Sequence, residues 1–150
     1  PPAIRWRGRH KRRLSEFKGR KGDCLEWHRH SKDTKPELLV RRLVHSLGYR
    51  YRLHDRKLPG NPDLVFGGRN KVIFVHGCFW HRHGAKKCPL ARLPKTRHEF
   101  WVPKLEQNRR RDQRNQRKLG LLGWRFLVIW ECQLRNLEGL KVRITDFLEG

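Results

Sequence analysis

Residues 63–76 read DLVF-GGRN-KVIFVH, and this stretch decides the fold. Two apolar runs, rich in β-branched and aromatic residues, flank the turn-forming sequence GGRN at residues 67–70. Such a pattern is typical of two strands joined by a short turn. We therefore predict a β-hairpin over residues 63–76.

The register of this hairpin has a chemical consequence. If Phe66 pairs with Lys71 across the turn, Asp63 faces Phe74 on the neighbouring strand. His76 lies two residues beyond Phe74 and therefore shares a sheet face with Asp63, diagonal to it at about 7–8 Å. The register thus predicts that a carboxylate and an imidazole converge at one end of the hairpin.

Asp63 has two readings. An aspartate after Pro62 can cap its own backbone in a turn. An acid that enters an apolar strand loses hydration, however, which favours a functional role. Mg²⁺ prefers oxygen ligands and commonly binds one or two carboxylates together with substrate phosphate. We predict that Asp63 and a backbone carbonyl at the same strand end, that of Val75, bind Mg²⁺ beside a phosphate.

Helices and a further strand are expected around the hairpin. Residues 34–37 (TKPE) form a capping box with proline in the first turn, and Gly48 is placed to end that helix. Glu37 either only completes this box or also serves an active site. The remaining predicted elements are an edge strand at Tyr49 to Leu53, a long basic helix at Phe100 to Leu119, an apolar strand at Trp124 to Trp130 and a short helix near Leu140 to Leu148. This mixture predicts a single α/β domain over residues 34–150, preceded by a basic arm over residues 1–33.

The charge of the chain indicates its partner. Lys and Arg number 37 against 14 Asp and Glu, a net charge of +23. Nucleic acid is the natural partner, because each neutralised phosphate releases a counterion. A ribosomal or histone-like protein would share this charge, so charge alone predicts no chemistry. The arm is either disordered or orders on DNA.

The sequence shows no membrane signal. No apolar run approaches the roughly 18 residues of a membrane span, and no signal-peptide core follows the start. We therefore expect no membrane partner. We also expect a cytoplasmic protein with reduced thiols that acts as a monomer.

Cysteines and histidines cluster directly after the hairpin. Cys78, His83 and Cys88 have the spacing of metal ligands, and Cys132 at the end of the apolar strand can supply a fourth. We predict a structural zinc held by these four residues. Alternatively, Cys132 is a small buried apolar residue. Cys24, in the arm, is left over.

Three histidines lie within this region: His76, His81 and His83. A neutral imidazole near pH 7 can take a proton from water and later return one, as phosphodiester hydrolysis requires. A zinc site would also hold Phe79 and Trp80 firmly between its ligands. These aromatics then either wedge into a base stack or pack in the core.

Four motifs together resemble one known family. They are KPELL at 35–39, LPG-x-PD at 58–63, FVHGCFWH at 74–81 and WEC at 130–132. In this order they resemble the very short patch repair (Vsr) endonucleases, over about residues 33–135. The resemblance implies a restriction-endonuclease-like central mixed sheet flanked by helices, with a structural zinc site. It also implies an enzyme that nicks one strand 5′ of the mispaired T in a T:G mismatch.

The resemblance also implies residue roles. Asp63 and Val75 resemble the magnesium ligands, and His81 resembles the general base, with His76 close to the scissile phosphate. Glu37 and Asp112 resemble the carboxylates that orient those histidines. The zinc ligands correspond to Cys78, His83, Cys88 and Cys132, and the intercalating aromatics to Phe79, Trp80 and Trp101. One departure is the spacing of four residues between His83 and Cys88, where some members have one.

Three functions therefore compete. The first is a mismatch nickase that acts on double-stranded DNA, with host mismatch-repair proteins as further partners. The second is a related restriction- or homing-type nuclease that cuts without a mismatch. The third is a zinc-stapled nucleic-acid-binding module without catalysis, which would need neither Asp63 in its strand nor the histidines.

Overall fold

The predicted hairpin lies in the middle of a four-stranded mixed sheet. The computed structural model describes residues 33–84 and 87–150, so the predicted basic arm lies outside the described residues except for Asp33. The strands are β1 (Arg52–Leu53), β2 (Leu64–Phe66), β3 (Lys71–His76) and β4 (Arg125–Trp130), in the spatial order β1-β2-β3-β4. The pairs β1–β2 and β2–β3 are antiparallel, and β3–β4 is parallel.

The hairpin register is the predicted one. Phe66 pairs with Lys71, and Leu64 pairs with Ile73. The connection is a short 3-10 turn, Gly67–Arg69, closed by Asn70, whose φ of 50° is in the left-handed region that asparagine tolerates. Asp63 and His76 therefore share one face of the sheet, as the register requires.

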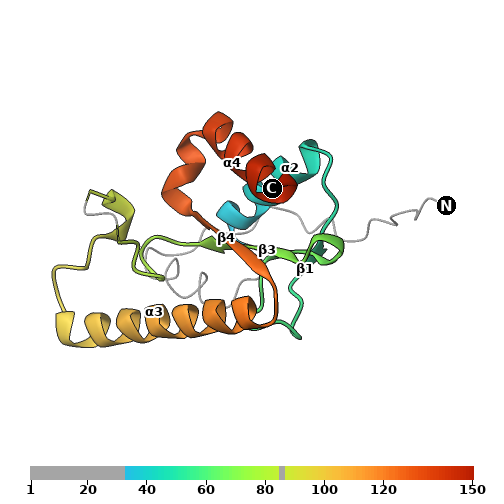
Figure 1. Cartoon of the computed structure of the whole chain (residues 1–150). Helices are drawn as coiled ribbons and strands as arrows, with labels where there is room; N and C mark the ends of the chain where they lie inside the picture. The colour runs from blue at the N-terminus through green and yellow to red at the C-terminus, as the bar shows by residue number, and fades with distance from the viewer. Residues whose placement is uncertain (1–32, 85–86) are drawn as a thin grey trace, which may run out of the picture. The chain divides into compact units, whose positions relative to one another are not determined.

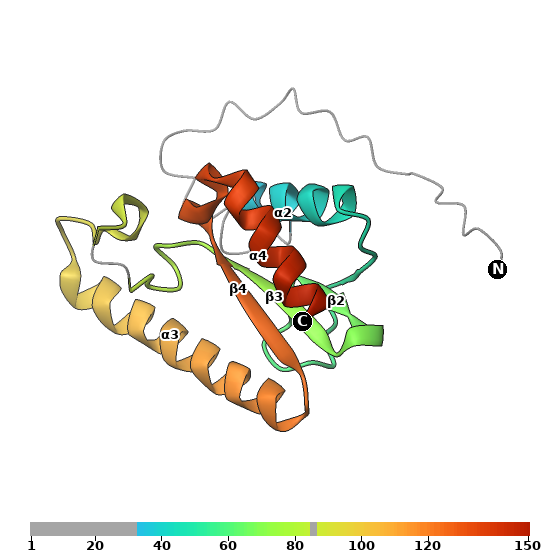
Figure 2. The ribbon, with the colours of Figure 1, turned by 45° about the horizontal axis from the view of Figure 1, so that its top comes forward.

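Helices cover both faces of the sheet (Figures 1 and 2). Helices α2 (Lys35–Ser46) and α4 (Leu137–Glu149) lie on one face, and α3 (His98–Leu121) crosses the other. Alternate residues of β3 serve the two layers, because successive side chains of a strand point to opposite faces. Ile73 and Val75 pack with α2 and α4, whereas Val72 and Phe74 pack on the α3 side with Leu119. This confirms the predicted α/β sheet flanked by helices.

Helix α2 has the predicted ends. Thr34 Oγ1 accepts a hydrogen bond from the N–H of Glu37. At the other end Gly48 has a φ of +89°, its N–H donates to the carbonyl of His45, and the N–H of Tyr49 donates to that of Val44. These two bonds are a Schellman motif, in which glycine is favoured because the residue is left-handed.

Several elements differ in length from their predictions, among them α4, which covers Leu137–Glu149 rather than Leu140 to Leu148. The edge strand covers only Arg52–Leu53, since Tyr49 and Tyr51 pack against the core and His54, with a φ of 49°, turns the chain away. Helix α3 begins at His98 and extends to Leu121, beyond the predicted Phe100 to Leu119.

None of the helices within residues 33–84 and 87–150 combines the length and the apolar character needed to cross a bilayer.

Candidate active site and metal centre

A hollow of about 200 Å³ lies between the end of the hairpin and helix α3. Strand β3 and the residue before β2 supply its floor, and α3 supplies one wall. The lining residues are Glu37, Gly60, Asn61, Asp63, Phe74, Val75, His76, His81, Arg111, Asp112, Asn115 and Gln116. The five residues predicted to be catalytic (Glu37, Asp63, His76, His81 and Asp112) and Val75 therefore meet at one place.

Asp63 is held by the neighbouring strand. Its Oδ2 accepts a hydrogen bond of 2.7 Å from the backbone N–H of Val75. Burial raises the pKa of Asp63 above its ordinary value, although the Val75 N–H, His54 and Arg41 act in the opposite direction. A buried carboxylate that resists ionisation is stabilised as an anion by a nearby cation.

Glu37 is a second buried carboxylate next to Asp63, with 8% of its surface exposed. Burial and the charge of Asp63 raise its pKa to about 7. Its Oε2 accepts a hydrogen bond of 3.2 Å from Arg41 Nη2, one helical turn away. Among the described residues it hydrogen-bonds to neither His76 nor His81. The expectation that Glu37 orients a histidine stays a prediction; in this structure α2 places Glu37 beside Asp63 and Arg41.

His76 and His81 form a stacked pair. Their ring centroids are 3.8 Å apart and their planes differ by 6°. Burial, and then the charge of His81, lowers the pKa of His76 to about 3. His76 is therefore a neutral imidazole throughout the physiological range, and at most one of the stacked rings is positively charged.

His81 is oriented by Asp112 of helix α3. Its Nδ1 lies 2.5 Å from Asp112 Oδ2. Burial works to raise the pKa of Asp112, but the hydrogen bond and charge of His81 outweigh it and hold that pKa below its ordinary value. Asp112 is therefore a carboxylate at neutral pH. It assigns the proton of a neutral His81 to Nδ1, and Nε2 keeps its lone pair.

The hollow contains the donor set of a hard cation. Asp63, Glu37 and the backbone of Val75 line the same space. Oxygen donors of this kind suit Mg²⁺, and the raised pKa values of the two carboxylates indicate negative charge that a divalent cation would stabilise. These residues thus fit a cation at the hairpin end of the hollow.

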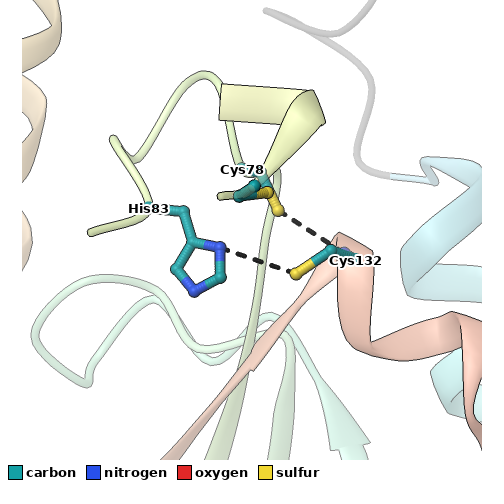
Figure 3. Close-up of side chains that lie close together, drawn as sticks. Cys78, His83 and Cys132 are labelled. Carbon is teal, nitrogen blue, oxygen red and sulfur yellow. Dashed lines mark hydrogen bonds between the residues drawn. The ribbon is translucent and has the colours of Figure 1, made fainter. Parts of the chain in front are cut away.

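A second group of potential metal ligands follows strands β3 and β4, and Figure 3 shows three of its members, Cys78, His83 and Cys132. Ligand atoms of Cys78, His83, Cys88 and Cys132 all lie within 4.8 Å of one another. His83 Nδ1 and Cys132 Sγ are 3.5 Å apart, and the backbone N–H of Cys132 donates to Cys78 Sγ at 3.4 Å. Ligand atoms on a tetrahedral zinc are about 3.4–3.8 Å apart. The four predicted residues therefore fit a closed zinc site.

Parallel pairing of β3 with β4 assembles this centre. Because His76 pairs with Trp130, the chain leaving each strand places Cys78 and Cys132 side by side. The His83 ring stacks on the Trp130 ring, with 4.4 Å between the ring centroids. Burial raises the pKa of Cys78 to about 12, although the hydrogen bond from the backbone N–H of Cys132 acts in the opposite direction. A bound metal cation would favour its thiolate.

The loop that carries these ligands is anchored on helix α3. Asn108 Nδ2 donates to the carbonyl of Trp80, and Arg82 pairs with Glu106 at 3.4 Å. With the His81–Asp112 bond, these contacts place the loop at one end of the hollow. Helix α3 therefore supports both the cysteine and histidine centre and the histidines of the hollow.

The three predicted wedge aromatics form a cluster with a fourth. Phe79 lies 5.1 Å from Trp80 and 5.4 Å from Trp101, and Phe100 lies 5.2 Å from Trp101. Lys104 is placed over the rings of Phe100 and Trp101. None of the four aromatic residues belongs to either core cluster of the described chain, and each is at least partly exposed. The cluster is a surface feature bordered by cations.

Comparison with known proteins identifies the family. The family model of the DNA mismatch endonuclease Vsr matches residues 18–87. The type II nicking enzyme V.XorIIP of Xanthomonas oryzae pv. oryzae is 52% identical over 119 residues, covering 79% of this chain and 85% of that protein. The DNA mismatch endonuclease Vsr of Escherichia coli is 44% identical over 110 residues, covering 73% of this chain and 69% of its own. This chain belongs to the Vsr DNA mismatch endonuclease family.

Membership confirms the resemblance seen in the sequence and makes the protein a DNA endonuclease. The catalytic domain of the homing endonuclease I-Bth0305I has a similar fold, with a TM-score of 0.53 and 21% identity. The alignment covers 77% of this chain and 94% of that domain. The Vsr-family chain thus has the predicted restriction-endonuclease-like architecture.

Sequence reasoning missed three contributors to the site. Arg41 contacts Glu37 and also His54, whose Nε2 lies 2.9 Å from Arg41 Nη2. Arg111 lines the hollow beside Asp112, and Phe100 extends the aromatic cluster. The spacing of Glu37 and Arg41, four residues apart in a helix, predicts that pair. The position of Arg111 requires knowing which face of α3 meets the sheet.

Proposed function

We propose that this Vsr-family endonuclease nicks one DNA strand 5′ of the mispaired T in a T:G mismatch. The observation that carries the proposal is the convergence of Asp63, His76 and the His81–Asp112 pair in one hollow. It is supported by the relative named a DNA mismatch endonuclease and by the matching family model.

His81 acts as the general base. Asp112 holds Nδ1–H, so Nε2 can take a proton from the attacking water. The water oxygen then bonds to phosphorus while the bond from phosphorus to the leaving oxygen breaks. His76, neutral and stacked on His81, donates an N–H to a phosphate oxygen. Its low pKa suits a hydrogen-bond donor that does not compete for the proton.

Mg²⁺ is the proposed catalytic cation, held by Asp63 and the carbonyl of Val75. When bound, it lowers the pKa of a coordinated water and stabilises charge on the phosphate. Glu37 supports the same end of the hollow as a second negative charge next to Asp63. Zn²⁺ is the proposed structural ion at Cys78, His83, Cys88 and Cys132.

The aromatic cluster accounts for the proposed preference of the enzyme for a mismatch. A wedge that enters a base stack costs about a few kcal/mol per step, and a mispaired base is already weakly stacked. Phe79, Trp80 and Trp101 therefore enter most readily beside a T:G pair. Lys104, above two rings of the cluster, is placed to contact the adjacent backbone.

A second candidate is a nickase of matched DNA. It is compatible with the relative named a type II nicking enzyme, which is 52% identical and whose name mentions no mismatch. The same catalytic residues would serve it, so the two functions differ only in what triggers entry of the wedge.

One cleavage assay separates these functions. End-labelled duplexes that differ only in carrying T:G, T:A or C:G at one position, within randomised flanking pairs, are incubated with Mg²⁺ or EDTA and resolved on a denaturing gel. The proposal expects a single nick 5′ of the T in the T:G duplex alone, and none in EDTA. Equal cleavage of all duplexes would refute the mismatch requirement and leave the second candidate.

A further inference from the structure

The hollow has an excess of negative charge, although its proposed substrate is a negatively charged phosphodiester. Three carboxylates line it, from Glu37, Asp63 and Asp112. A phosphodiester that enters this space is repelled by each of them, and a cation at Asp63 offsets the repulsion at one end only. The opposite wall, formed by α3, needs a positive charge of its own.

Arg111 supplies that charge. It is the single lysine or arginine among the described residues that line the hollow. Its guanidinium lies close enough to lower the pKa values of both His76 and Asp112. Its Nη2 is 3.8 Å from Asp112 Oδ1, and 55% of its side chain is exposed. At 3.8 Å this is an ion pair rather than a hydrogen bond, so the N–H groups are not committed to Asp112.

Other cations of α3 face elsewhere. Arg110, Arg114 and Arg117 line a separate groove on another side of the helix, together with Glu106. Residues 111, 112, 115 and 116 instead face the hollow, as the helical repeat requires. The position of Arg111 is therefore set by the same turn of helix that places Asp112 against His81.

We propose that Arg111 is a further catalytic residue, whose guanidinium binds a non-bridging oxygen of the scissile phosphate and stabilises the charge that develops there during cleavage. The proposal rests on the proposed function of the hollow as a phosphodiester hydrolase. Arginine suits the role because its planar fork of donors matches phosphate oxygens and its charge persists at all relevant pH values. Asn115 and Gln116, on the same face, complete a polar wall without adding charge.

Cleavage kinetics test the proposal with a matched control. Arg111→Ala, Arg111→Lys and Arg114→Ala are compared in single-turnover cleavage at saturating DNA, on whichever duplex the wild-type enzyme cuts. Arg111→Ala should slow cleavage by about 10²–10³-fold, as loss of one charge-stabilising donor does. Arg111→Lys should recover part of the rate. Arg114→Ala should weaken binding and keep the saturated rate. Equal saturated rates for the two alanine variants would overturn the proposal.

A binding experiment locates the contact. Duplexes with a neutral methylphosphonate at the cleaved phosphate, or at a phosphate one helical turn away, are titrated with the 150-residue chain in buffer without Mg²⁺. The wild type and Arg114→Ala should lose affinity when the cleaved phosphate is neutralised, whereas Arg111→Ala should lose none. An equal loss in Arg111→Ala contradicts the assignment. A wild-type enzyme that cuts no duplex refutes the proposed function and this inference together; cutting of matched DNA refutes only the mismatch requirement.

Discussion

His81 Nδ1 lies 2.5 Å from Asp112 Oδ2, joining the loop after β3 to the middle of helix α3. This bond determines which ring nitrogen of His81 carries the proton. The carboxylate fixes the ring and its tautomer, so that Nε2 of a neutral His81 keeps its lone pair. The stacked His76 completes a pair in which one ring can accept a proton and the other remains neutral.

The first prediction concerns this pair. Asp112→Asn keeps the shape of the side chain but removes the charge that assigns the proton of His81 to Nδ1. Single-turnover cleavage should fall by about 10²–10⁴-fold, the usual contribution of a general base. Glu138→Gln is the control, because Glu138 is exposed on α4 and pairs with Lys141, away from the hollow. A rate for Asp112→Asn that equals the control would remove Asp112 from the proton-transfer apparatus.

The second prediction concerns the cation site. Asp63→Ala should slow cleavage by about 10²–10³-fold or more, while DNA affinity in buffer without Mg²⁺ changes little. The affinity persists because the lysines and arginines supply it. Asp55→Ala is the control, since Asp55 is an ordinary turn residue whose Oδ1 accepts from the N–H of Lys57. Near-wild-type cleavage by Asp63→Ala would place the cation elsewhere.

The third prediction concerns the zinc centre. Metal analysis should find one zinc per chain, and Cys132→Ser or chelation should lower the melting temperature sharply. The reason is that the free energy of zinc binding contributes directly to folding. Cys24→Ser tests the ligand set from outside the described residues: full zinc content in this variant means that Cys78, His83, Cys88 and Cys132 suffice. A metal-free chain with unchanged melting contradicts the site.

The fourth prediction separates the wedge from the core. Trp101→Ala should reduce the ratio of T:G to T:A cleavage and retain most non-specific affinity. Its cost in stability should fall below the roughly 3–5 kcal/mol of a fully buried tryptophan, because Trp101 is only half-buried. Trp124→Ala is the control, since Trp124 packs against the core on the α3 side and should lower the melting temperature without changing the ratio. An unchanged ratio for Trp101→Ala, with a large loss of stability, would make Trp101 a packing residue.

The fifth prediction concerns pH. The pKa of Glu37 is about 7 in the folded chain against an ordinary value of 4.5, so the folded state holds this proton more tightly than the unfolded state. As pH rises from about 4.5 to about 7, the wild type should therefore lose stability relative to Glu37→Gln, by on the order of a few kcal/mol. His76, whose pKa is lowered to about 3, acts in the opposite direction below pH 6.5. The informative quantity is thus the difference between the two melting curves in buffer without Mg²⁺, and a constant difference across this window would contradict the burial of Glu37.

Local pattern determined a large part of this molecule. Two apolar runs and turn chemistry predicted the hairpin and its register, and hence the meeting of Asp63 with His76. Capping residues predicted both ends of α2, because a cap is satisfied by neighbours in sequence. The spacing of Cys78, His83 and Cys88 predicted metal ligation for a similar reason, since these ligands share one loop.

Only the tertiary structure decided the rest. Parallel pairing of β3 with β4 brings Cys132 to Cys78, and no local rule selects a parallel partner so distant along the chain. The angle at which α3 crosses the sheet determines that Asp112 and Arg111 face the hollow while Arg114 does not. The same limit applies to Glu37, because the motif predicts a carboxylate near the site, whereas the packing of α2 determines that this carboxylate lies beside Arg41 and Asp63. Sequence periodicity reports which residues share a face, but the neighbour of that face depends on how distant elements pack.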